Sequence, residues 1–409
     1  MPDFHQGGLI STLHRLGRPR VDRLEAELLA LGRSRPIALV LPCLHAELKG
    51  PGLKGIVDVL RGVGYLRQIV VSISGTERRG EYEDMRSLFD GVTSVEGEAP
   101  VLLWNSGPRV RALYERLQSE GLDAGSDGKG RSTWLAYGYV LATHVSRVIA
   151  VHDCDILTYD REFLARLCYP TVNPNLNYEF AKGYYGRVSD RLYGRVTRLF
   201  VTPLLRAMKA VLGSHPLLDY LDSFRYALAG ECSMTTDLAR INRIPSDWGL
   251  EIGTLVEVYR NCSPKRICQV ELAENYDHRH QELSEDDASR GLHRMVTDIA
   301  SSAIRNLASY GVEFDAGFLN TLTAAYRRTA QDAIAAYSHD AALNGLCFER
   351  HEEELAVETF SRALRVAGLG FVREPMEVPQ IPNWSRVTSA LPGFLDELRE
   401  AVEADAAGA

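Results

Sequence analysis

Long apolar runs, paired cysteines and an excess of positive charge are all missing from this 409-residue sequence. Typical apolar stretches, such as residues 37–41 and 148–151, have the length of core strands and fall far short of the roughly 20 residues that span a bilayer. Residues 1–8 contain no basic stretch followed by an apolar run, so we expect no secretory signal. We therefore predict a cytoplasmic protein that does not associate with a membrane.

Cysteine usage and net charge exclude further classes of protein. The number of cysteines is odd and no two have Cys-x-x-Cys spacing, so we predict neither a disulfide framework nor a zinc site, and expect most of them to be buried. The seven are Cys43, Cys154, Cys168, Cys232, Cys262, Cys268 and Cys347. A formal net charge of −8 argues against a nucleic-acid partner. It leaves room for a phosphorylated small molecule, because a local basic pocket can work within an acidic protein.

The order of apolar segments in the first half predicts an α/β fold. Short buried-strand patterns at residues 37–41, 68–73, 101–104 and 147–152 alternate with helical patterns such as those at 20–32 and 53–60. This alternation is typical of a mostly parallel sheet with helices on both faces. Ligands bind such sheets beyond the carboxyl ends of the strands, where Pro42, Ser74 and Asp153 fall.

The second half changes character twice. Residues 169–280 are less regular and rich in Gly, Tyr and Asn, as in loops that build a binding site over a sheet. After residue 281 the spacing becomes helical, with a predicted start at residues 284–287 and further helices near 292–307, 316–338, 350–366 and 392–404. We therefore predict a domain over residues 1–281, with halves at about 30–160 and 161–281, and a helical extension over 282–409. The extension is expected to pack on the sheet domain, to form a homodimer interface, or both.

Two carboxylates at the end of an apolar strand are the sharpest chemical signal. Asp153 and Asp155 lie two residues apart immediately after the strand pattern 147–152. Both can reach one divalent cation and the phosphates that it carries, and Mg²⁺ or Mn²⁺ prefers such oxygen ligands. A metal would also neutralise the charge that develops on a pyrophosphate leaving group. The alternative is that the carboxylates cap the following helix.

Three further segments are candidates for binding charged groups. Lys129 has a glycine on each side, which lets backbone and ammonium approach a phosphate, although the rest of a Walker A loop is missing and a flexible surface turn is the alternative. Arg195, between Gly194 and Thr197, can bind phosphate or carboxylate with two parallel hydrogen bonds, or lie on a surface helix. Glu251 fits a helix N-terminus.

Histidines after a fifth strand pattern complete the candidates. His278 and His280 follow the strand-like residues 267–272 and flank Arg279. A neutral imidazole here can ligate a metal, and solvated loop histidines are the alternative.

Taken together, these motifs resemble the glucosyl-3-phosphoglycerate synthase family, which is related to the mannosyl-3-phosphoglycerate synthases. The resemblance runs through residues 37–281, with the motifs in the family's order. It implies a GT-A fold, a Rossmann-like and mostly parallel sheet flanked by helices. It also implies a metal-dependent, retaining glycosyltransferase that uses Mg²⁺ or Mn²⁺, here with the C-terminal helical extension in addition.

The resemblance also implies roles for individual residues. For the donor nucleotide it implies contacts from the Pro-x-Leu segment and from side chains after the next strands, namely Pro42, Leu44, Glu47, Ser74, Lys129 and Asp153. Glu47 stands one place later than the family's pattern has it. Asp155 and His278 match the metal ligands, and Asp155 and Glu251 match the catalytic carboxylates. The implied acceptor contacts are Gly194, Arg195, Thr197, Arg279 and His280, the last standing where the family usually has asparagine.

The function implied is transfer of glucose, with retention, from a nucleotide-diphosphate glucose to 3-phosphoglycerate in glucosylglycerate synthesis, a compatible-solute pathway. UDP-glucose is the favoured donor. The departing phosphate would take the acceptor's proton, so catalysis would consist mostly of positioning and charge stabilisation. Alternatives are a mannosyl-3-phosphoglycerate synthase using GDP-mannose, a nucleotidyltransferase, and a non-catalytic protein that binds a sugar nucleotide.

Overall fold

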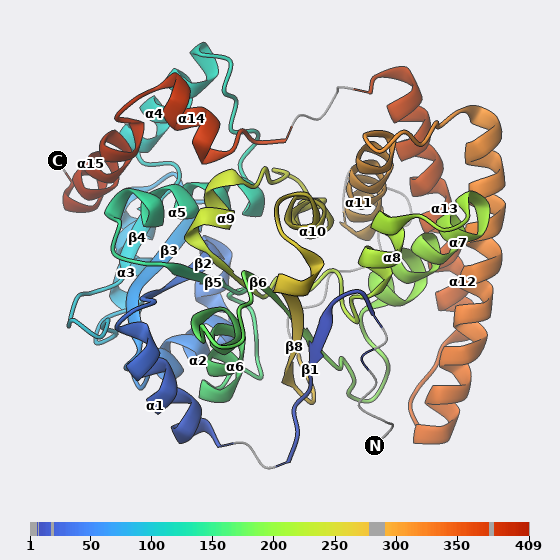
Figure 1. Cartoon of the computed structure of the whole chain (residues 1–409), viewed down its shortest axis with the longest axis horizontal. Helices are drawn as coiled ribbons and strands as arrows, with labels where there is room; N and C mark the ends of the chain where they lie inside the picture. Colours follow the sequence, from blue (N-terminus) through green and yellow to red (C-terminus); the bar gives the residue numbers. More distant parts are fainter. Residues whose placement is uncertain (1–5, 7, 18–19, 278–290, 376–379, 409) are drawn as a thin grey trace.

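Alternating apolar segments build an eight-stranded sheet in the computed structural model, which describes residues 6, 8–17, 20–277, 291–375 and 380–408 (Figure 1). The strands are β1 (Ser11–Leu13), β2 (Ile37–Leu44), β3 (Leu66–Ser74), β4 (Val101–Trp104), β5 (Val148–Val151), β6 (Phe180–Tyr185), β7 (Cys232–Thr235) and β8 (Ile267–Ala273). Their order is β1-β8-β6-β7-β5-β2-β3-β4. Every pairing is parallel except the two that β7 makes with β5 and β6, so the predicted mostly parallel sheet is confirmed.

Helices cover both faces of this sheet (Figure 1). In the first part of the chain they are α1 (Val21–Gly32), α2 (Pro51–Leu60), α3 (Arg79–Leu88), α4 (Pro108–Ser119), α5 (Lys129–Thr143), α6 (Arg161–Val172), α7 (Thr202–Leu212), α8 (Pro216–Asp222), α9 (Thr236–Ile241) and α10 (Leu250–Asn261). Shorter turns are the 3₁₀ helices η1 (His45–Lys49) and η3 (Pro264–Arg266) and the π-helical turn η2 (Thr197–Val201).

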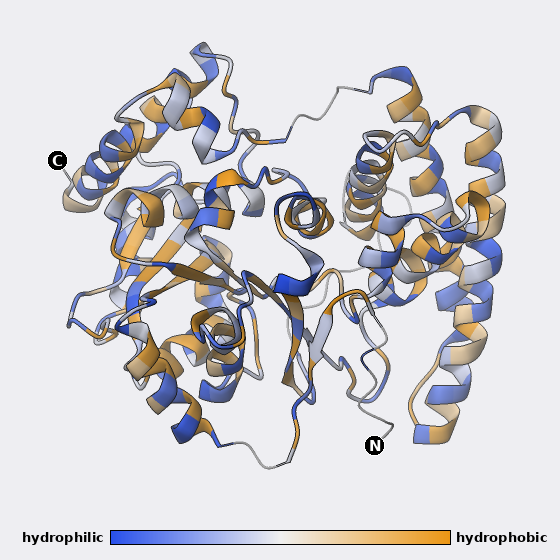
Figure 2. Ribbon diagram, in the orientation of Figure 1, coloured by the Kyte–Doolittle hydropathy of each residue, from blue (hydrophilic) through white to orange (hydrophobic). Residues whose placement is uncertain are grey.

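Strand periodicity sorts the core into two layers. In β2, Ile37, Leu39 and Leu41 belong to one apolar cluster, which also holds side chains of α1, α2, α3 and α6. Ala38 and Val40 of the same strand belong to the other cluster, with side chains of α5, α9 and α10. Successive side chains of a strand point to opposite faces, so one apolar run supplies both layers. Figure 2 shows the strands as strongly apolar and the outer helices as two-faced.

The C-terminal helices pack on the sheet domain from two sides (Figure 1). They are α11 (Gly291–Ala308), α12 (Ala316–Asn344), α13 (Arg350–Arg373), α14 (Trp384–Ala390) and α15 (Phe394–Ala407). Helices α11–α13 lie against α7, α10 and each other, whereas α14 and α15 lie against α4, α5, α9 and β4. Apolar side chains of all five join the core cluster of α5 and α10, which confirms the expected packing on the sheet. The predicted start at residues 284–287 and the boundary between residues 281 and 282 lie outside the described residues, and the boundary stays a prediction.

Two sequence-based boundaries needed correction. The first strand was expected to stop near Leu41, but β2 continues through Pro42 to Leu44 while β5 stops pairing at Val40. Residues 169–280, expected to be irregular, contain the buried strands β6 and β7. Gly, Lys and Tyr in β6 and the shortness of β7 hide the apolar pattern that would have predicted them. Within the described part of the chain, no helix has both the length and the apolar content to cross a bilayer.

The last helix is tied to the sheet domain by a buried carboxylate. Asp405 of α15 is 2% exposed, and its two oxygens accept hydrogen bonds from the backbone N–H groups of Arg109 and Val110, each at 3.1 Å. These N–H groups belong to the first turn of α4, and the N–H groups of a first turn have no hydrogen-bond acceptor within their own helix. Asp405 thus caps α4 from a position about 300 residues away in sequence.

We expect Asp405→Ala to lower the free energy of unfolding by about 1–2 kcal/mol, the usual effect of losing a helix cap. Urea denaturation followed by circular dichroism measures the change. Glu403→Ala is the matched control, because Glu403 lies exposed on the same helix. Equal stability of the two variants would contradict the capping role.

Candidate active site

The carboxyl ends of β2, β3 and β5 meet at one edge of the sheet, as the sequence predicted. Pro42 is buried in β2, Leu44 is 51% exposed at its end, and Glu47 follows in η1. Ser74 ends β3, is 3% exposed, and its hydroxyl has no hydrogen-bond partner in the structure. Four predicted donor-binding residues therefore lie along one edge, three on the neighbouring strands β2 and β3 and Glu47 in the turn that follows β2.

One lysine forms ion pairs with two carboxylates at the centre of the site. Lys129 Nζ lies 2.6 Å from Asp153 Oδ1 and 3.0 Å from Glu251 Oε1. Burial by itself would lower the pKa of Lys129, but the two carboxylates outweigh it and hold that pKa well above its usual value. The ammonium is therefore charged at all physiological pH values. Three residues that the sequence placed on separate motifs are brought into contact.

Helix geometry explains why this pairing is needed. Lys129 is the first residue of α5, where the positive end of the helix dipole disfavours a cation. Glu251 lies in the first turn of α10, where a carboxylate is favoured. The dipole therefore supports the Glu251 charge and opposes that of Lys129, and the two carboxylates offset the opposition.

Close backbone approaches fix the two aspartates. A Cβ atom on Gly230 would lie 2.5 Å from Asp153 Oδ2, and one on Gly52 of α2 would lie 2.7 Å from the backbone carbon of Asp155. Both glycines therefore let a neighbouring segment pack where a side chain would collide.

His152, between β5 and Asp153, is fully buried. Burial lowers its pKa to about 4, so its imidazole is neutral at physiological pH.

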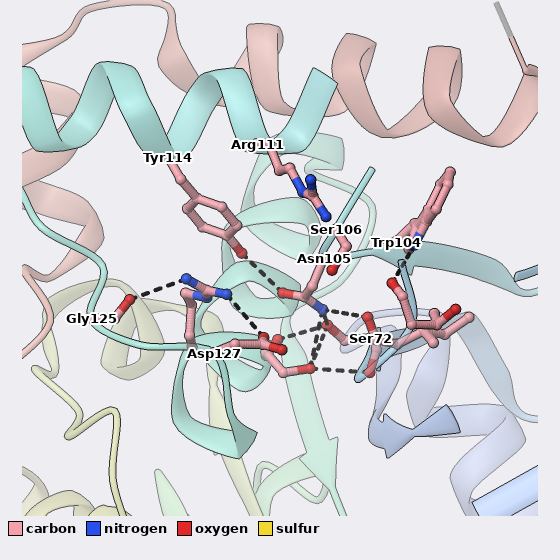
Figure 3. A network of polar contacts seen from close by, with 12 residues as sticks. Ser72, Trp104, Asn105, Ser106, Arg111, Tyr114, Gly125 and Asp127 are labelled. Atoms are coloured by element: carbon pink, nitrogen blue, oxygen red, sulfur yellow. Dashed lines mark hydrogen bonds and ion pairs between the residues drawn. The ribbon is translucent and has the colours of Figure 1, made fainter. Parts of the chain in front are cut away.

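A polar network that the sequence analysis missed positions the start of α5 (Figure 3). Asn105, after β4, donates from Nδ2 to Ser72 Oγ at 2.9 Å and to the Ile73 carbonyl at 3.0 Å, and its Oδ1 accepts from the Tyr114 hydroxyl at 2.9 Å. Ser72 of β3 and Ser132 of α5 bond each other's carbonyls at 2.9 and 3.0 Å. The sequence signal was a small polar residue inside a strand pattern (Ser72), directly after another (Asn105) and in the first turn of a helix (Ser132).

The described residues line a cavity of about 850 Å³ next to the ion pair. Of the predicted residues its wall holds Lys129, Asp153, Gly194, Arg195, Thr197 and Glu251. The other predicted residues that the structure describes, Pro42, Leu44, Glu47, Ser74 and Asp155, are not in that wall. His278, Arg279 and His280 lie outside the described residues. The cavity thus joins the ion pair to the predicted acceptor segment.

Helix α13 lines this cavity beside Arg195. Arg195 lies 3.0 Å from Glu353 Oε1 and 3.5 Å from Glu352 Oε2, and Arg198 lies 3.2 Å from Glu353 Oε2. Glu353 is 6% exposed, so a buried carboxylate of the C-terminal helices holds both arginines. Arg195 itself is 27% exposed, so it lies between this buried carboxylate and the open cavity.

Side chains that could ligate a metal do not cluster among the described residues. No three His, Cys, Asp or Glu side chains there gather into a group that could hold an ion. All seven cysteines are free, and all but Cys347 are buried, as predicted.

Sequence comparison decides the family. No protein-family model matches the chain. A glucosyl-3-phosphoglycerate synthase of Persephonella marina is 43% identical over 405 residues, covering 99% of this chain and 99% of that protein. One from Methanococcoides burtonii is 40% identical over 408 residues, covering 98% of each. This chain belongs to the glucosyl-3-phosphoglycerate synthase family. The predicted family and the predicted glycosyltransferase class are confirmed.

Solved structures of the same family confirm the GT-A fold. A glucosyl-3-phosphoglycerate synthase of Mycobacterium tuberculosis in complex with Mn²⁺, UDP-glucose and phosphoglyceric acid superposes with a TM-score of 0.51 at 23% identity, covering 75% of this chain and 88% of that one. The complex of that enzyme with Mg²⁺ and UDP gives a TM-score of 0.50 at 23% identity, covering 76% and 89%.

A pair of partly buried aspartates beside the site makes the stability of the fold depend on pH. Burial, and then the charge of Asp247, raises the pKa of Asp298 in α11 to about 6. Burial likewise raises the pKa of Asp247, whose Oδ1 accepts from the Gly249 N–H at 2.8 Å, two residues before Glu251. The folded state therefore binds more protons than the unfolded chain between about pH 4 and pH 6. The contribution of the protonated Asp298 carboxyl group to stability is complete below about pH 4 and is lost as the pH rises through about 6.

We expect Asp298→Asn to stabilise the fold by about 1–2 kcal/mol at pH 7.5 and to have almost no effect at pH 4. Urea unfolding at both pH values measures the difference. Asp332→Asn, at a side chain that is 61% exposed on α12, is the control and should change stability equally at both. A pH-independent effect of Asp298→Asn would show that its carboxyl group is not perturbed.

Proposed function

We propose that this protein transfers glucose from UDP-glucose to the hydroxyl of 3-phosphoglycerate, with retention at the anomeric carbon. The proposal extends to a cytoplasmic homodimer that makes the precursor of glucosylglycerate, a compatible solute. One observation carries it: Lys129, Asp153 and Glu251 meet in the wall of the cavity that also holds Arg195 and Thr197. A site for a donor diphosphate and a site for an anionic acceptor are thereby contiguous.

The donor half fits a nucleoside diphosphate that carries a divalent cation. Asp153 and Asp155 offer oxygen ligands after β5, and a Mg²⁺ or Mn²⁺ ion takes its further ligands from substrate phosphates and water. By the family resemblance the two protein ligands are Asp155 and His278, and Asp153 contacts the donor. When bound, the ion would neutralise charge on the departing diphosphate. Pro42, Leu44, Glu47 and Ser74 would hold the nucleotide, and the buried Ser74 hydroxyl still has its hydrogen-bonding capacity to offer.

The chemistry left to the chain is positioning and charge stabilisation. Lys129 adds a fixed positive charge beside the diphosphate, and Glu251 holds Lys129 while facing the sugar. Arg195, Thr197 and Gly194 would orient the acceptor, together with Arg279 and His280 by the family resemblance. The acceptor hydroxyl then approaches the anomeric carbon on the face that the diphosphate leaves. The departing phosphate oxygen accepts the hydroxyl proton, so no enzyme nucleophile is required.

The decisive assay measures nucleotide release from UDP-glucose and, in parallel, from GDP-mannose, with Mg²⁺ and with or without 3-phosphoglycerate. We expect release from UDP-glucose that depends on the acceptor and is abolished in Asp155→Asn. Proton NMR of the product should show an α-glycoside, which retention from α-linked UDP-glucose requires. Preference for GDP-mannose would identify the mannosyl enzyme, and absence of acceptor-dependent release from either donor would refute the acceptor.

Close packing of α2 against Asp155 gives a second test. Gly52→Ala should lower kcat at least tenfold and raise the Mn²⁺ concentration needed for half-maximal rate, because the added Cβ displaces the Asp155 backbone. Gly55→Ala in the same helix is the control, since nothing lies within 4 Å of a Cβ there and alanine favours a helix. If Gly52→Ala had wild-type metal dependence, the placement of Asp155 by α2 would be wrong.

A further inference from the structure

The cavity wall carries more negative than positive charge. Its described lining residues include six carboxylates and four cations, the latter being Lys129, Arg187, Arg191 and Arg195. A phosphorylated carboxylic acid brings several negative charges. Such a wall attracts it most strongly where a cation is not already matched by a carboxylate of the protein.

Three of the four cations have carboxylate partners. Lys129 is held by Asp153 and Glu251, as described above. Arg195 is held by Glu353 and Glu352 of α13. Arg191 is paired with its neighbour Asp190 at 3.3 Å. The charge of each is therefore largely compensated before any acceptor arrives.

Arg187 differs from the other three. Its Nη1 donates a 3.0 Å hydrogen bond to the Tyr226 hydroxyl, and its buried Nε has no acceptor among the described residues. Within the described ranges, no carboxylate lies within ion-pair distance of its guanidinium, although the side chain is partly buried. A buried charged donor without a partner is unfavourable by itself, which points to a ligand that supplies the missing acceptor.

The backbone around Arg187 is held firmly for such a role. Arg187 follows β6 by two residues, and the carbonyl of Gly186 accepts from the Tyr276 N–H at 2.9 Å. Its own carbonyl accepts from the Tyr193 N–H at 2.9 Å, in the segment that leads to Gly194. A side chain whose backbone is fixed by hydrogen bonds on both sides can bind a ligand with little loss of conformational entropy.

We propose that Arg187 binds the phosphate or carboxylate of the acceptor, as the cavity cation that no carboxylate of the described residues pairs with. This inference rests on the proposed function, because it takes 3-phosphoglycerate as the anion. Arg187 supplies charge and a planar set of donors, whereas Arg195, restrained by Glu353, supplies orientation. The guanidinium suits either anionic group, since both accept two parallel hydrogen bonds.

The test compares wild-type enzyme with Arg187→Gln and Arg187→Lys in steady-state kinetics. We expect Arg187→Gln to raise the KM for 3-phosphoglycerate at least tenfold while the KM for UDP-glucose changes less than twofold. Arg187→Lys, which keeps the charge but loses the planar fork, should fall between. Arg206→Gln is the control, because Arg206 is 63% exposed on α7 and is not in the cavity wall.

Calorimetric titration separates this inference from the proposed function. 3-Phosphoglycerate is titrated into enzyme with Mg²⁺ and UDP, where no turnover occurs, and Arg187→Gln should bind it at least tenfold more weakly than wild type. Equal affinity, or equal KM values, would overturn the role of Arg187 while leaving the function standing. If wild type bound no 3-phosphoglycerate, the proposed acceptor would be wrong, and inorganic phosphate would be titrated instead. Equal or absent binding of phosphate to wild type and Arg187→Gln would then overturn the anion site too.

If circular dichroism shows that Arg187→Gln does not fold, Arg187→Lys is compared with Tyr226→Phe. Tyr226→Phe leaves the guanidinium in place, so it should weaken acceptor binding less than Arg187→Lys does; an equal or larger effect would contradict the role of Arg187.

Discussion

Lys129 lies between Asp153 and Glu251, and the arrangement of the whole site depends on this contact. It ties the start of α5 to the end of β5 and to the start of α10, three segments that belong to different parts of the chain. Burying the ammonium is unfavourable, and so is placing it at the N-terminus of a helix. Two carboxylates at hydrogen-bond distance compensate for both effects, so the lysine keeps a charge where phosphates are expected to bind.

Small residues lie around this contact wherever a neighbouring segment packs closely against a charged residue. Gly230 and Gly52 leave room for Asp153 and Asp155, and the Ser72–Ser132 pair closes the gap between β3 and α5. None of these residues takes part in chemistry in the proposed mechanism. They act by fixing the positions of the charged groups, which is what a reaction driven by positioning and charge stabilisation demands.

The C-terminal helices likewise fix charged groups, here on the side of the cavity that holds Arg195. Glu353 of α13 restrains Arg195 and Arg198, and at the opposite end of the molecule Asp405 of α15 caps α4. The extension is thus built into both halves of the glycosyltransferase domain. Its acidic side chains pair with Arg195 and not with Arg187, and the different roles that we propose for the two arginines rest on this difference.

Much of the fold and part of the site followed from the sequence alone. The apolar runs 37–41, 68–73, 101–104 and 147–152 predicted β2, β3, β4 and β5, because buried parallel strands carry a signal in every residue. Asp153 and Lys129 were identified from local spacing and from the family's motifs. Strands β6 and β7 escaped, since a Lys in β6 and a Ser in β7 become buried only through contacts made elsewhere.

The remainder was decided by tertiary structure, because it consists of contacts between residues far apart in the chain. Lys129 and Glu251 are 122 residues apart, and Arg195 and Glu353 are 158 apart. A sequence shows that each residue carries a charge, but whether that charge is compensated depends on which distant group folds against it. The sequence by itself therefore determined the family, the sheet and the kinds of chemical group at its edge. Only the tertiary structure decided which of those groups are paired, because ion pairing depends on distance in space and burial rather than on order along the chain.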